Sequence, residues 1–147
     1  MIFKEVLRPP IWVLAFIYFL LLSLVIAIWA AFDNTVTLIA FVASTIAIFY
    51  IAFVMRSTIT FDGKELRIDR AHIDIKYLGN AKILDSSAMR LLRTRDADPA
   101  AYLAIRFWIP TGLKIAVVDS RDPTPYWLIT SKRSEEIAAL LNKSSNF

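Results

Sequence analysis

The chain contains few of the side chains that carry out covalent or metal chemistry. It has no cysteine and one histidine, His72, which excludes disulfides, thiolate nucleophiles, Cys-ligated metal sites and sites that need two imidazoles from one chain. Asp69 and Asp74 lie close to His72, but no neighbouring side chain has the context of an activated nucleophile. The scattered glycines form neither a Walker-type loop nor a dinucleotide-binding GxGxxG motif. We therefore expect no catalytic residues, no metal and no cofactor.

The most unusual local sequence favours binding. In Asp122-Pro-Thr-Pro-Tyr126-Trp127 two prolines fix the backbone just before an aromatic pair. Because tyrosine and tryptophan dominate interface energetics, Tyr126 and Trp127 are candidate anchors of a surface that binds a protein partner. Asp122 and Trp108 would complete this surface. The simpler interpretation is a structural turn at the start of the last strand.

Three arginines at the end of a short predicted helix offer a second kind of binding. Arg90, Arg93 and Arg95 could face anionic lipid headgroups, where each positive charge contributes about 1 kcal/mol. They do not form a dense polybasic run, so a solvated helix end is the alternative.

Arg106 lies in a predicted strand whose alternate residues are apolar, and we expect it to form a structural ion pair with Asp98 or Asp122. The net charge of +4 results from 17 basic and 13 acidic residues that are interspersed. Because no RNP-like aromatic motif accompanies these charges, we expect no nucleic-acid partner.

Two long apolar segments must position the rest of the chain. No charge occurs from Ile11 to Phe32 or from Thr35 to Val54, and at about 1.5 Å per residue each run would cross the roughly 30 Å hydrocarbon core of a bilayer as a helix. Only Asp33 and Asn34 separate them. The sequence therefore predicts a transmembrane helical hairpin in residues 1–55, with spans at about 11–32 and 35–54. The first run is also too long for the apolar core of a cleaved signal peptide.

Positive charges predict the orientation of this hairpin. Lys4 and Arg8 precede the first span and Arg56 follows the second, whereas the turn has no positive charge. By the positive-inside rule both termini should lie on the cytoplasmic side of the plasma membrane. Small residues of the second span, at 40, 43, 44 and 47, would pack within the hairpin or support a homo-oligomer.

The remaining residues, 56–147, show the pattern of a strand-rich domain. Asp62-Gly63 predicts a two-residue turn in which Phe61 pairs with Lys64. Alternating apolar residues predict further strands, and capping residues predict two helices. The predicted strands lie around 71–77, 103–107, 113–117 and 126–131, and the predicted helices around 86–93 and from 134.

These elements define an α+β membrane protein. Its N-terminal two-helix transmembrane hairpin precedes a small antiparallel β barrel or sandwich with a C-terminal helix, on the cytoplasmic side. This order of elements is that of pleckstrin-homology-like domains, a likeness of fold that does not fix function.

Several stretches have a distinctive composition: DPAAY at 98–102, RFWIP at 106–110, DPTPYWLITS at 122–131 and the entry Pro-Pro-Ile-Trp at 9–12. Through these stretches, the span pair and the closing helix, the chain resembles an uncharacterised actinobacterial two-span membrane family, domain of unknown function 3093. The resemblance implies two spans, a cytoplasmic domain and a bacterial host, and it assigns no catalytic residue.

Three functions follow as hypotheses. The first is a membrane-anchored interaction module that binds a protein partner or a membrane complex. The second is recognition of anionic lipid headgroups by the same domain through Arg90, Arg93 and Arg95. The third, an enzyme at the membrane surface, is the least favoured because no acid, base and nucleophile occur in a recognisable arrangement. The expected partners are membrane lipids and a protein, including a second copy of the chain.

Overall fold

The computed structural model describes residues 2–145 and divides the chain into two compact units. One unit is Arg8–Arg56, and the other combines Met1–Leu7 with Ser57–Phe147. The division differs from the predicted one, which assigned the first seven residues to the hairpin. The physical reason is a strand at the N-terminus, described below.

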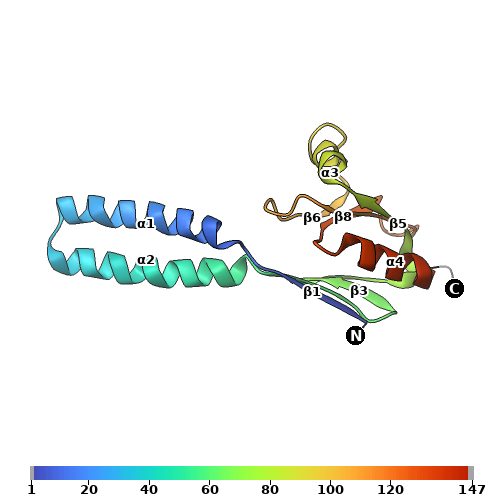
Figure 1. Cartoon of the computed structure of the whole chain (residues 1–147), viewed down its shortest axis with the longest axis horizontal. Helices are drawn as coiled ribbons and strands as arrows, with labels where there is room; N and C mark the ends of the chain where they lie inside the picture. Colours follow the sequence, from blue (N-terminus) through green and yellow to red (C-terminus); the bar gives the residue numbers. More distant parts are fainter. Residues whose placement is uncertain (1, 146–147) are drawn as a thin grey trace. The chain divides into compact units, whose positions relative to one another are not determined.

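The first unit is a pair of apolar helices, α1 (Ile11–Ala31) and α2 (Asn34–Val54), each long and apolar enough to cross a membrane. Figure 1 shows them antiparallel and joined by a very short connection. Asp33 begins α2, because its carboxylate accepts a hydrogen bond from the Val36 N–H at 2.9 Å. Across the pair, the Tyr18 and Thr45 hydroxyls lie 3.1 Å apart.

The second unit begins with an N-terminal strand that the sequence analysis did not predict. Strands β1 (Phe3–Leu7), β2 (Ser57–Phe61), β3 (Glu65–Ile68) and β4 (Ala71–Asp74) form an antiparallel sheet in that order. Phe3 pairs with Phe61, and Leu7 with Ser57. The chain thus leaves this sheet at Leu7, passes through both apolar helices, and returns to the neighbouring position at Ser57.

The turn between β2 and β3 differs from the predicted two-residue turn. Phe61 pairs with Leu66, two positions beyond the expected Lys64. The Asp62 carboxylate accepts hydrogen bonds from the N–H groups of Lys64 and Glu65, both at 2.9 Å, and Gly63 has a φ of 94°. The side-chain bonds of Asp62 therefore favour a longer turn. Because the shift is two residues, the same side chains still face the core.

The second sheet is mixed. Strands β5 (Leu78–Leu84), β7 (Gly112–Val117), β8 (Tyr126–Thr130) and β6 (Tyr102–Ala104) lie in that order, and β6 runs parallel to β8. A short 3-10 helix, Ile75–Tyr77, connects the two sheets. Within the described residues the strands form two four-stranded sheets and no closed barrel. Of the predicted barrel or sandwich, the barrel is therefore wrong, and the predicted antiparallel pairing is corrected by the parallel pair β6–β8.

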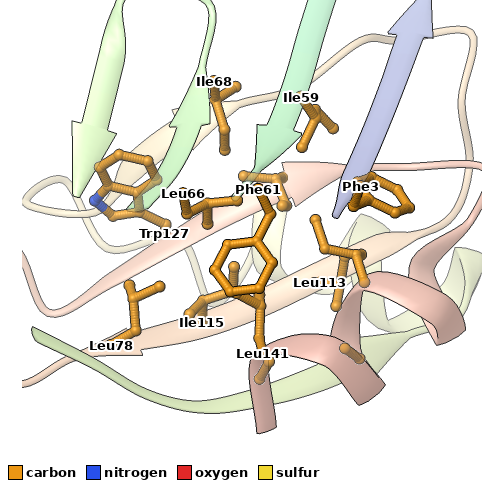
Figure 2. Close-up of a cluster of buried hydrophobic side chains, with 14 of the residues drawn as sticks. Phe3, Ile59, Phe61, Leu66, Ile68, Leu78, Leu113, Ile115, Trp127 and Leu141 are labelled. Atoms are coloured by element: carbon orange, nitrogen blue, oxygen red, sulfur yellow. The ribbon is translucent and has the colours of Figure 1, made fainter. Parts of the chain in front are cut away.

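The core lies between the two sheets and is closed by α4 (Ser134–Ser145). Figure 2 shows Phe61, Leu66 and Ile68 of the first sheet facing Ile115 and Trp127 of the second. Helix α3 (Ser86–Arg93) packs on the outer face of the second sheet through Met89, against Tyr126 and Leu128. Strand β8 is therefore buried on both faces.

Candidate functional site

A cleft of about 600 Å³ lies between α3 and the connection from β6 to β7. Ser86, Ser87, Arg90, Arg93 and Thr94 line one side, and Phe107 and Pro110 line the other. Residues three, four and seven positions apart share one face of a helix. The α3 residues of the cleft therefore form one continuous polar stripe.

The sequence of α3 explains both its start and its orientation. The carboxylate of Asp85 accepts hydrogen bonds from the Ala88 N–H at 2.8 Å and the Ser87 hydroxyl at 2.7 Å, and these bonds lower the pKa of Asp85. On the face away from the cleft, Met89 is buried and Leu92 packs beside it. The apolar face fixes the helix on the sheet, which leaves the arginine face outward.

The cleft is electropositive. Among the described residues, no carboxylate forms an ion pair with Arg90 or Arg93, and no acidic residue lines the cleft. Arg93 is half-buried and Arg90 is exposed. Arg95, the third predicted headgroup contact, is exposed and does not line the cleft. The structure therefore brings together two of the three predicted arginines.

The predicted aromatic surface is corrected. Tyr126 and Trp127 are each only 6% exposed, because β8 is the strand that α3 and the first sheet cover from opposite sides. Trp127 packs in the main core and contacts the Tyr102 ring at a centroid distance of 4.6 Å. Trp108 is half-buried against the same core, and Asp122 is exposed. The two central anchors therefore expose too little surface to anchor a protein partner.

The predicted ion pair is also corrected. Arg106 pairs with Asp69 at 3.1 Å, whereas the Asp98 carboxylate accepts a hydrogen bond from the Ala100 N–H at 2.9 Å. The side chains of Arg106 and Asp69 are 29% and 38% exposed, so solvent weakens this pair. Burial, with a smaller contribution from the Asp69 charge, raises the pKa of Tyr102 nearby.

Asp69 is a structural residue that sequence reasoning missed. Its carboxylate accepts hydrogen bonds from the Ser57 hydroxyl at 2.9 Å and the Thr58 N–H at 2.8 Å, in addition to Arg106. Its φ of 54° lies in the left-handed region, which aspartate tolerates better than most residues. The available signal was the polar pair Asp69-Arg70 between two segments of alternating apolar residues, which is typical of a turn between strands.

Comparison with known proteins supplies the family. A family model described as "Protein of unknown function (DUF3093)" matches residues 2–141. This chain belongs to the DUF3093 family. The match runs from β1 into α4 and so includes the apolar helix pair as well as both sheets. No curated protein and no solved structure matches the chain.

A second cleft of the DUF3093 chain is more acidic. About 490 Å³ in volume, it is lined by His72, Tyr77, Trp127 and several carboxylates. Three of these carboxylates already have cationic partners, in the pairs Glu65–Arg67, Asp74–Lys76 and Asp119–Arg121. Within residues 2–145 no group of three or more His, Cys, Asp or Glu side chains is arranged to hold a metal ion. The α3 cleft, whose arginines have no carboxylate partner within that range, is therefore the better candidate for a ligand-binding site.

Proposed function

We propose that this DUF3093 protein is an integral membrane protein whose two helices span the plasma membrane and whose sandwich is a binding module at the cytoplasmic surface. The observation that carries the proposal is the pairing of β1 with β2. Leu7 and Ser57 are partners in the sheet, and α1 begins four residues after one while α2 ends three residues before the other. The N-terminal residues and the sandwich must therefore lie on the same side of any membrane that the hairpin crosses.

The exposure of the helices supports a bilayer as their environment. Large apolar side chains such as Trp12, Phe19, Ile26, Phe49 and Phe53 are all more than 60% exposed in the chain itself. Soluble monomers rarely expose contiguous apolar patches beyond a few hundred Å². Hydrocarbon accepts such a surface, and the helix backbones satisfy their own hydrogen bonds there.

Charge supports the cytoplasmic side. The strand that precedes the hairpin carries Lys4, and Arg8 and Arg56 flank the two helices. The Asp33-Asn34 turn carries no positive charge. We extend the proposal to a bacterial, actinobacterial host and to a pleckstrin-homology-like fold of the sandwich, which its two sheets and C-terminal helix support.

The role of the sandwich in this proposal is binding rather than catalysis. Tethering raises the effective concentration of the module at the membrane surface, so that modest contacts suffice. The electropositive α3 cleft favours an anionic ligand. A protein partner or a larger membrane complex is the second candidate, favoured by the exposed side chain of Phe107, which lines the same cleft.

Single cysteines test the membrane arrangement, because the natural chain has none. Lys4→Cys, Asn34→Cys and Lys143→Cys place one thiol at each of three exposed positions. In intact cells a membrane-impermeant thiol reagent should label only Asn34→Cys, whereas permeabilised cells should give labelling at all three. The cysteine-free chain is the control. Labelling of Lys4→Cys and Lys143→Cys on opposite sides, or of all three in intact cells, would refute the proposal.

A further inference from the structure

We propose that the α3 cleft binds the phosphate group of an anionic membrane lipid, with Arg90 and Arg93 as the residues that contact it. This inference rests on the proposed function, because the sandwich must lie at a membrane surface for the lipid to reach it. It names the ligand class of the binding module. The lipid site would consist of two arginines that have no carboxylate partner among the described residues, the hydroxyl groups beside them, and the apolar wall opposite.

The two arginines are available for an external anion. In the described part of the chain neither forms an ion pair, unlike Arg67, Arg121 and Arg133, which have carboxylate partners. Arg90 and Arg93 are three residues apart on one helix, so their side chains extend from the same face. Guanidinium groups bind phosphate oxygens through paired N–H donors, which gives this site both charge and geometry.

The hydroxyl groups of the cleft add polar contacts on the same side. Ser86 lies one turn before Arg90 and lines the cleft. Ser87 and Thr94 also line it, although their hydroxyls already donate to Asp85 and to the Arg90 carbonyl oxygen. Their oxygens remain acceptors and favour a ligand that also carries hydroxyl groups, as a glycerol or sugar headgroup does.

The opposite wall favours a lipid over free phosphate. Phe107 is 59% exposed and lines the cleft together with Pro110. An exposed phenyl ring beside paired cations matches the pattern of membrane-surface segments, in which Phe, Trp or Leu enters the acyl boundary and Lys or Arg meets the headgroups. A soluble phosphate would use the arginines and leave this apolar wall in water.

Binding by the full chain tests the inference. The protein, purified in a neutral maltoside detergent, is titrated with phosphatidylglycerol and separately with phosphatidylcholine, and native mass spectrometry counts the bound lipids. At about 1 kcal/mol per arginine, Arg90→Gln or Arg93→Gln should weaken phosphatidylglycerol binding about 5-fold, and the double variant about 30-fold. The matched control is Arg70→Gln with Arg95→Gln, which removes two exposed arginines that do not line the cleft. Phe107→Ala should weaken lipid binding while leaving the charge unchanged.

Each outcome decides the inference. Equal losses in the cleft variant and the control variant would show diffuse charge attraction and overturn the site. Unchanged binding in the cleft variant would do so directly. If inorganic phosphate competes with the lipid on equal terms and Phe107→Ala has no effect, the cleft is a free-phosphate site and the lipid assignment is wrong. Should the double variant fail to fold, the two single variants carry the same test. Cysteine labelling is independent of the arginines, so failure of the membrane arrangement is distinguishable from failure of the lipid site.

Discussion

Replacing Glu5 by alanine tests the role of the N-terminal strand. Glu5 lies in β1 and is 7% exposed. Its two carboxylate oxygens accept hydrogen bonds from the Ser131 hydroxyl at 2.5 Å and the Lys132 N–H at 2.9 Å. These two donors lie in the connection between β8 and α4. Glu5 therefore joins the first strand of the domain to the segment that leads into its last helix.

The expected loss of stability follows from these contacts. A hydrogen bond to a charged group contributes about 1.5–3 kcal/mol, and two are lost. Removing a buried carboxylate also recovers part of its desolvation cost. Because Ser131 is fully buried, its hydroxyl loses its acceptor without gaining water. We expect Glu5→Ala to lower the free energy of unfolding of the sandwich by about 2–4 kcal/mol.

Denaturant unfolding of the full chain in detergent, followed by tryptophan fluorescence, measures this change. Lys4→Ala is the matched control, because the neighbouring side chain is exposed and its removal should change stability by less than about 0.5 kcal/mol. A double-mutant cycle with Ser131→Ala isolates the coupling between the two side chains. If Glu5→Ala were no more destabilising than Lys4→Ala, β1 would not be held by this contact and the reasoning would be wrong.

Three further changes test the packing and the turns. Gly112→Ala should lower the free energy of unfolding by about 1–3 kcal/mol, because a Cβ would overlap the Ile129 carbonyl oxygen; thermal unfolding measures it. Trp127→Ala should cost about 3–5 kcal/mol, whereas a docking role would leave stability unchanged and reduce only partner capture. The backbone N–H groups of Glu65 and Lys64 lower the pKa of Asp62 below its ordinary value of 3.8. This stabilisation is present above pH 3.8 and is lost as the pH falls through the lowered pKa. Acid unfolding curves of Asp62→Asn and the natural chain should therefore converge at low pH, and constant separation would contradict the assignment.

The sequence predicted local features of this fold well. The bounds of the two apolar helices agree with the uncharged runs to within one residue. They could be predicted because the uncharged run and the polar turn that ends it are both local features of the sequence. The strands around Asp62-Gly63 were also found. The register was two residues off, because the bonds that the Asp62 side chain makes to the backbone compete with the two-residue turn.

Features that depend on distant contacts were missed. Phe3–Leu7 has the alternation of a strand, but its partner β2 lies beyond both helices, and nothing local indicates such a pairing. Tyr126 and Trp127 were candidate surface anchors, with a structural turn as the alternative. Their burial depends on α3 and the first sheet, which cover β8 from opposite sides. Arg106 was expected to pair with Asp98 or Asp122, both nearer in sequence, whereas the sheet arrangement brings it to Asp69.

The two helices reduce the entropy cost of bringing β1 next to β2, which are far apart in the sequence. Pairing β1 with β2 across a flexible segment of such length would cost entropy that the short strands would have to offset. Here α1 and α2 have 21 residues each, so each extends about 32 Å at 1.5 Å per residue. Antiparallel helices of equal length return the chain to the level at which it left. A helical hairpin therefore ends with Leu7 and Ser57 near each other, which lowers the entropy cost of pairing β1 with β2.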